Sequence, residues 1–248
     1  SISIVYQRRI AYTALAVSDN QTESAHPIPS NARAAASPNG NQRAYAHTTP
    51  GPEDTWEPLE EHLNAVAERA AWFASAFGAE AWGRLAGLWH DLGKYSEAFQ
   101  SYLRASAARA GFDSSTETAP GRVDHSTAGA QHAVTRAPHA GRLIAYAIAG
   151  HHAGLADRGS PSSAGTLEAR LAKTEVSIAD AIRRAPRAIT EQSIPPPPHL
   201  RLGPGAQGAG FSFAFLTRML FSALVDAAPG DLYRYRLDGG PDLLPDPA

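Results

Sequence analysis

The sequence predicts an all-α protein, and three observations support this fold class. From about residue 58 onward, apolar residues recur at spacings of three and four, the period of helices that pack on a core. No stretch alternates apolar and polar residues over the length of a β-strand. Glycine and proline stand at the ends of the apolar segments, where they commonly stop helices.

The composition is that of a folded protein, except for an N-terminal segment that is poor in large apolar residues. Apolar residues make up 43% and charged residues 19% of the 248 residues, which is typical of a globular protein. Residues 18–41 are rich in Ser, Asn, Ala and Pro and hold few large apolar side chains, so they cannot build a core. We expect a poorly ordered tail over residues 1–43 and one domain over residues 44–248, with a stiff proline-rich connector at residues 195–198.

The expected helices follow from the apolar stripes and their stop signals. Gly93 follows the second apolar segment, at a position that usually requires a positive φ, and Asp124 is a plausible N-cap. We expect residues 111–122 to form a loop and Pro138 to end a helix. The expected helices span residues 58–77, 80–92, 94–109, 124–137, 143–149, 167–184 and 211–228.

Charge and cysteine content exclude several classes of protein. The chain has no cysteine, which excludes disulfides, thiolate catalysis and cysteine-rich zinc modules. Its net charge of −2 argues against a protein that coats nucleic acid through its overall charge. No apolar run approaches the roughly 20 residues that cross a membrane, and Arg8 and Arg9 interrupt the opening apolar stretch. We therefore expect a cytoplasmic protein with no membrane partner.

Histidines and aspartates gather on or at the ends of the apolar helices, not in the polar loops. Burying so many polar groups without compensation costs a few kcal/mol for each of them, roughly. A cation inside the bundle removes this cost because it turns the buried groups into ligands. The candidate metal ligands are His62, His90, Asp91, His125, His151, His152 and Asp226.

The spacing of these residues favours two ions over one. Neighbouring helical residues point about 100° apart, so His90 and Asp91 do not easily chelate one ion together. A carboxylate between two ions, with imidazoles on either side, fits better, and ion pairs about 3.5–4 Å apart recur in phosphoester hydrolysis. Nitrogen and oxygen ligands suit Mn, Fe, Co, Ni or Zn, and Mg is also compatible.

Three segments, GLWHDLGKYSEAFQSYL, VDHSTAGAQ and IAGHHAGLAD, resemble the HD nuclease domain of CRISPR-associated systems. That domain is the nuclease part of the type I helicase-nuclease effector. The upstream WEPLEEHLNAVAERAAWFA and the downstream FLTRMLFSALVDA match the same family in order and spacing, so the resemblance covers residues 45–228. It implies an HD-superfamily helical bundle with a dinuclear metal site in its core.

The resemblance also implies a role for each matched residue. All seven candidate ligands fall on the family's two-metal site, with Asp91 as the bridge and Lys94 beside the scissile phosphate. The implied activity is endo- and exonucleolytic cleavage of single-stranded DNA, which a helicase feeds to the nuclease after a guide-RNA-loaded CRISPR surveillance complex recruits them. The chain has no phosphate-binding Gly-Lys-Thr loop, so the helicase is a separate subunit or another part of a longer protein. Asp226 departs from the pattern because Ala227, Ala228 and Pro229 follow it where the family has further acidic residues.

The remaining histidines and basic residues have simpler interpretations. His47 also matches a family position and is a further candidate ligand, although a role in the turn or behind the ligands is favoured. We expect His132 and His139 at the surface, and His26 and His199 in loops. Basic residues between 170 and 187 form either a solvated face or a contact surface for DNA or helicase.

Two other functions are compatible with an HD bundle. One is a small-molecule phosphohydrolase that acts on nucleotides or cyclic dinucleotides in a closed pocket. The other is a catalytically inactive docking module, which would purify without stoichiometric metal. The second is disfavoured because every expected ligand position is filled.

Overall fold

The computed structural model describes residues 43–49, 51–108, 123–198 and 205–228, and the structural statements that follow refer to these residues. They belong to one compact unit, residues 41–248. Except for Arg43, the expected tail over residues 1–43 lies outside the described residues. The expected loop at 111–122 and the expected loop positions of His26 and His199 lie outside them as well.

Helices make up most of the regular structure in the described chain, and the all-α bundle is confirmed. Two strands of three and two residues are the exception. In chain order the elements are β1 (Tyr45–His47), η1 (Glu53–Thr55), β2 (Glu57–Pro58), α2 (Leu59–Ser75), α3 (Glu80–Trp89), η2 (Leu92–Tyr95), α4 (Glu97–Ala108), α5 (Ser126–Arg136), α6 (Ala140–Gly150), α7 (Leu167–Leu171), α8 (Val176–Arg184), α9 (Arg187–Thr190) and α10 (Gly205–Ala227).

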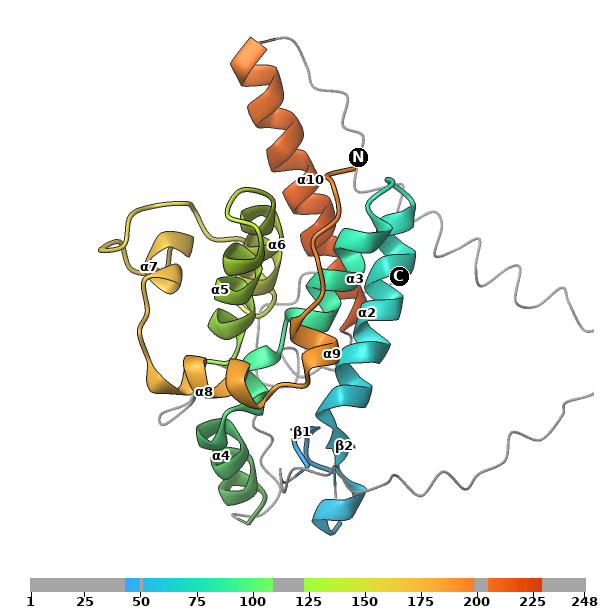
Figure 1. The fold of residues 1–248 in the computed structure, drawn as a ribbon, viewed down its shortest axis with the longest axis vertical. Helices are drawn as coiled ribbons and strands as arrows, with labels where there is room; N and C mark the ends of the chain where they lie inside the picture. The colour runs from blue at the N-terminus through green and yellow to red at the C-terminus, as the bar shows by residue number, and fades with distance from the viewer. Residues whose placement is uncertain (1–42, 50, 109–122, 199–204, 229–248) are drawn as a thin grey trace, which may run out of the picture. The chain divides into compact units, whose positions relative to one another are not determined.

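The core lies between two helix pairs, α2 with α3 and α5 with α6, and the C-terminal half of α10 packs against both (Figure 1). Trp82 and Trp89 of α3 are almost fully buried, so their indole N–H groups need partners. Trp89 donates to the backbone oxygen of Ile189 (2.8 Å), and Trp82 donates to that of Pro195 (3.2 Å). These bonds fasten α9 and the proline-rich segment to α3.

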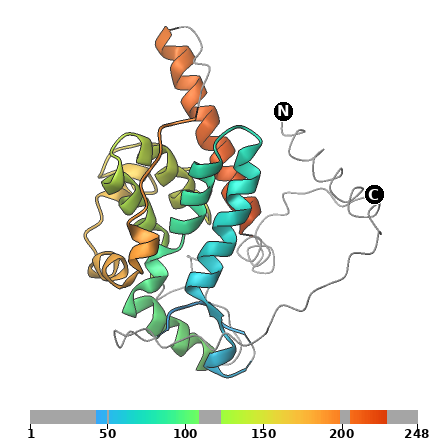
Figure 2. The ribbon, with the colours of Figure 1, turned by 45° about the vertical axis from the view of Figure 1, so that its right-hand side comes forward.

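The N-terminal half of α10 extends beyond the other helices (Figure 2). Phe211, Phe213 and Phe215 on this half are exposed, whereas Leu216, Leu220 and Leu224 enter the core. Contrary to our expectation of no such run, residues Gly208–Ala227 are long and apolar enough to cross a membrane by length and composition. This is a weak indication, because a core helix passes the same test, and the C-terminal half of α10 packs in the core.

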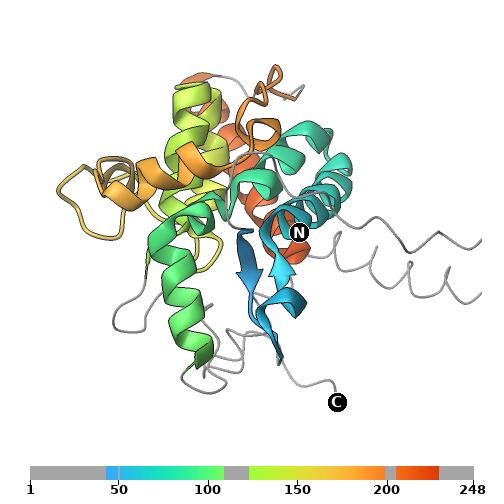
Figure 3. The same cartoon turned by 60° about the horizontal axis from the view of Figure 1, so that its bottom comes forward.

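The strands β1 and β2 pair antiparallel beside α4 (Figure 3). Alternation over two or three residues is too short to stand out in a sequence, which explains why the sequence did not predict this ribbon. The side chain of Gln100 holds β1 in place: its Oε1 accepts from the N–H of Tyr45 (3.1 Å), and its Nε2 donates to the oxygens of Tyr45 (2.9 Å) and Lys94 (2.7 Å).

Two expected helices are shorter than predicted. The second ends at Trp89 instead of residue 92, and the next begins only at Glu97, with the 3-10 turn η2 between them. Ser96 is extended and its hydroxyl accepts from the N–H of Phe99 (3.2 Å), as an N-cap does. The predicted cap Asp124 accepts from the N–H of Thr127 (3.1 Å) at the start of α5.

The expected long helix over residues 167–184 is divided into α7 and α8. The amide of Gln131 donates to the backbone oxygens of Leu171 (3.2 Å) and Lys173 (2.8 Å). These carbonyls, at and just after the end of α7, therefore have partners outside a helix, and Glu175 is extended before α8 begins. The amphipathic pattern continues across the break, which explains why the sequence suggested one helix.

Gly93 brings η2 against the start of α5, but it does so without the positive φ that we expected. A Cβ at this position would lie 2.2 Å from the backbone oxygen of His125, to which the N–H of Gly93 donates (3.0 Å). Only glycine allows the two backbones to approach this closely. The contact places His125 next to Asp91.

We expect Gly93→Ala to lower the free energy of unfolding by about 1–3 kcal/mol, because the backbone of His125 must move away. Gly210→Ala is the matched control, since Gly210 lies in α10 and a Cβ there would meet nothing within 4 Å. That control should be neutral or stabilise by up to about 1 kcal/mol. Urea unfolding of the two variants measures the difference, and equal stability would contradict the close-contact explanation.

Candidate metal centre

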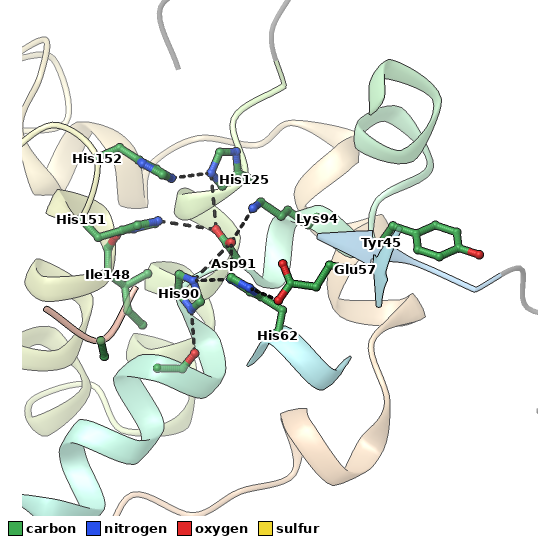
Figure 4. A network of polar contacts seen from close by, with 12 residues as sticks. Tyr45, Glu57, His62, His90, Asp91, Lys94, His125, Ile148, His151 and His152 are labelled. Atoms are coloured by element: carbon green, nitrogen blue, oxygen red, sulfur yellow. Dashed lines mark hydrogen bonds and ion pairs between the residues drawn. The ribbon is translucent and has the colours of Figure 1, made fainter. Parts of the chain in front are cut away.

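Six of the predicted ligands converge where three helices begin or end (Figure 4). His90 and Asp91 follow α3 directly, and His125 precedes α5. His151 and His152 follow the last residue of α6, and His62 comes from the first turns of α2. Five of the six are buried, and His152 is half-buried.

One oxygen of Asp91 faces His62 and His90. The Oδ2 atom lies 3.5 Å from Nε2 of His62 and 3.2 Å from Nε2 of His90, and these two nitrogens are 3.4 Å apart. Two donors that are each about 2.1 Å from one ion, at angles of about 90–110°, are separated by about 3.0–3.4 Å. The triangle therefore fits a shared ion.

The other oxygen of Asp91 faces a second set of imidazoles. The Oδ1 atom lies 3.4 Å from Nε2 of His125 and 3.5 Å from Nε2 of His151. Nε2 of His152 lies 2.9 Å from that of His125. Both sets satisfy the distances expected of ligands that could hold a metal ion, and they share Asp91.

Hydrogen bonds at the far side of three rings determine which nitrogen faces the carboxylate. Nδ1 of His90 lies 2.7 Å from the oxygen of Gly87, and Nδ1 of His151 lies 2.6 Å from that of Ile148. Nδ1 of His62 lies 3.1 Å from Oε1 of Glu57. An Nδ1–H donated to each oxygen leaves the Nε2 lone pair facing the oxygens of Asp91, which is repulsive unless a cation or a proton lies between them.

The titration of these groups reflects this conflict. Burial raises the pKa of Asp91, but the charges of His90 and Lys94 outweigh it and hold the pKa well below its usual range. Burial lowers the pKa of His62, but hydrogen bonds to Asp91 and Glu57 outweigh it and raise the pKa to about 9. Burial also lowers the pKa of His90, and burial together with His151 and His125 lowers that of His152.

Lys94 is 1% exposed, and its Nζ lies 2.7 Å from Oδ2 of Asp91. The turn η2 places the side chain there. Lys94 follows Asp91 by three residues, and the N–H of Lys94 donates to the backbone oxygen of Asp91 (2.9 Å). Phe99 covers the ammonium, 5.7 Å from the ring centroid. The ion pair with Asp91 compensates for the burial of this ammonium.

The remaining predicted residues lie elsewhere. Asp226 is on the exposed side of the last turn of α10, outside each group of described residues that could hold a metal. His47 is buried, with its ring 5.0 Å from that of His62, and forms a further such group with His62 and Glu57. The sequence did not point to Glu57, because only the unpredicted ribbon brings it to His62.

The prediction that His132 lies at the surface is wrong, because its side chain is buried. Its Nε2 lies 3.0 Å from the oxygen of Thr190, and its ring packs edge-on against Trp89 (4.8 Å between centroids). It fastens α5 to the end of α9 and takes no part in the metal centre. His139 is exposed, as expected.

The family model described as "Cas3, HD domain" matches residues 45–209 of the chain. The chain belongs to this family. The Cas3 HD family is a CRISPR-associated family of metal-dependent nucleases, which accounts for the metal-binding arrangement. The match covers every residue around Asp91 but ends before Asp226. No curated protein matches the chain.

Asp124, next to His125, forms an ion pair with Lys173 at the start of α5. Burial raises its pKa, but the bonds to Lys173 and Thr127 outweigh it and lower the pKa to about 2. Because the folded pKa lies below the usual 3.8, the carboxylate stabilises the fold above pH 4, and this contribution is lost as pH falls toward 2.

We expect Asp124→Asn to lower the free energy of unfolding at pH 7 by about 2 kcal/mol. The difference from the parent should shrink as pH falls from 4 to 2, where the parent loses the same contribution. Asp54→Asn, at an exposed position, serves as the control. Urea unfolding across this range measures the effect, and a difference independent of pH would rule out the ion pair as its source.

Proposed function

We propose that this Cas3 HD-family chain is a metal-dependent nuclease that cleaves single-stranded DNA, both internally and from ends, in type I CRISPR interference. The observation that carries the proposal is the buried carboxylate of Asp91 between two sets of imidazoles. In this proposal the protein acts in the cytoplasm. It works with a helicase and with the guide-RNA-loaded complex that recruits them.

The proposed centre holds two divalent ions, one at each oxygen of Asp91. His62 and His90 would hold the first ion, and the second would be held by His125, His151 and His152. This nitrogen-rich set suits Mn, Fe, Co, Ni or Zn better than Mg. When bound, such a pair activates water and neutralises the charge that develops on a phosphodiester.

Each side chain of the centre has a distinct task. Asp91 fixes the separation of the two ligand sets, and the hydrogen bonds at Nδ1 of His90 and His151 orient their rings. Lys94 would bind a non-bridging oxygen of the scissile phosphate, and its charge would stabilise the transition state. Asp226 stays a proposed ligand for which a change at the end of α10 would be needed, because its side chain is exposed there.

The first test is cleavage of circular single-stranded DNA by protein that has been stripped of metal and resupplied with Mn, Co, Ni, Fe, Zn or Mg. We expect metal-dependent cleavage, and its loss in Asp91→Ala, because both ligand sets depend on this carboxylate. A circle has no ends, so its cleavage demonstrates endonuclease activity.

Two outcomes of this test would favour the other functions. Hydrolysis of nucleotides or cyclic dinucleotides with intact circles would favour the phosphohydrolase. Folded protein that takes up no metal and cleaves nothing would favour the docking module.

Lys94→Met separates binding of metal from chemistry. Methionine retains the length and apolar stem of the buried side chain but removes its charge. We expect metal content to stay within a few-fold of the parent, whereas the cleavage rate falls about 100-fold, the typical effect of losing one group that stabilises developing charge. A parallel loss of metal would instead assign Lys94 to the assembly of the centre.

A further inference from the structure

The β1–β2 ribbon lies against one ligand, His62, through two side chains. In the register of the ribbon, His47 is opposite Glu57, so their side chains are neighbours across the two strands. Oε1 of Glu57 is 3.1 Å from Nδ1 of His62, and the ring of His47 meets that of His62 edge-on at 5.0 Å. His62 is therefore held by a carboxylate at one ring nitrogen and by a second imidazole at its side.

This ribbon is fixed relative to the centre on a second side. Gln100 of α4 is 4% exposed and bonds both to the backbone of Tyr45 in β1 and to the oxygen of Lys94 in η2. One buried amide thus joins the strand beside Glu57 to the turn that carries Lys94. The backbone of β2, which carries Glu57, is held in turn by its pairing with β1.

Glu57 differs in charge from the groups that orient the other rings. His90 and His151 each have a peptide oxygen at Nδ1, from the preceding turn of their own helix. His62 alone among these three has a carboxylate at Nδ1. A carboxylate behind a ligating imidazole fixes its tautomer and makes Nε2 a stronger donor.

We propose that Glu57 is a positioning residue for His62 and thereby tunes the affinity of only one metal site, the one at Oδ2 of Asp91. The inference rests on the proposed function, since it assumes two ions. The second set, His125, His151 and His152, has no contact with Glu57 in the described structure. The loss of such a carboxylate weakens metal binding by about 10–100-fold, and the lower end applies here because Glu57 is 43% exposed.

The test is titration of the metal-free full chain with Co²⁺, followed by calorimetry and by the visible absorption of the bound ion. The variants are Glu57→Leu, which removes the acceptor, and Glu57→Gln, whose amide oxygen still accepts from Nδ1–H but carries no charge. Glu60→Gln is the matched control, because it removes a carboxylate from the exposed side of the first turn of α2.

We expect Glu57→Leu to weaken one binding step about tenfold and to leave the other unchanged, with Glu57→Gln between it and the parent. Glu60→Gln should match the parent, and all the proteins should stay folded with chelator present. Unchanged affinity in Glu57→Leu would overturn the proposal, and so would an equal loss in both steps with a lower melting temperature, since that indicates a structural role.

The same measurements separate this inference from the nuclease assignment. If the parent binds Co²⁺ and shows the Glu57 effect but cleaves no DNA with any metal, the nuclease proposal fails and the positioning role stands. If the parent cleaves DNA and Glu57→Leu binds Co²⁺ normally, only the positioning role fails. If the parent binds no Co²⁺, both proposals fail together.

Discussion

The carboxylate of Asp91 is fully buried, with four imidazoles and one ammonium within 3.5 Å of its oxygens. An uncompensated charge at such a position would cost far more than the fold can supply, so everything near it must be arranged to offset this cost. Lys94 offsets part of it directly. The imidazoles offset it only when a proton or a cation lies between their Nε2 atoms and the carboxylate, so the arrangement around Asp91 is one that could hold a metal ion.

This constraint explains why the helices end where they do. Adjacent ligands in the middle of one helix point about 100° apart and do not easily converge on one carboxylate, whereas ligands at the ends of several helices can. The pair after α3, the residue before α5 and the pair after α6 reach the same place because three helix ends meet there. The meeting requires backbones in direct contact, and Gly93 against His125 supplies it. The hydrogen bonds from Trp82 and Trp89 of α3 to the backbone of Pro195 and Ile189 then hold this helix in position.

Much of the site could be predicted from the sequence because histidines and an aspartate beside apolar helices are costly to bury unless they bind a cation. What the sequence did not reveal depends on contacts between distant segments. Glu57 reaches His62 only through a ribbon too short to give a pattern, and His132 is buried by α9, whose Thr190 comes 58 residues later. The division of the predicted helix over residues 167–184 depends on Gln131, a side chain from another helix. Local periodicity carries no information on any of these contacts.

The two sides of Asp91 are not equivalent, and the difference bears on how the centre would work. The set on the Oδ1 side has three histidines, of which His125 and His151 contact this oxygen. Two histidines face Oδ2, where Lys94 also lies. An ion with fewer protein donors keeps positions for substrate, as catalytic sites do, whereas a fuller set of protein ligands is typical of structural ones. In the proposed nuclease the phosphate would therefore approach on the Oδ2 side, where it also meets the ammonium of Lys94. Glu57 acts on this same side, because it contacts His62. In the proposed centre its carboxylate would therefore raise the metal affinity of the site that has fewer protein ligands.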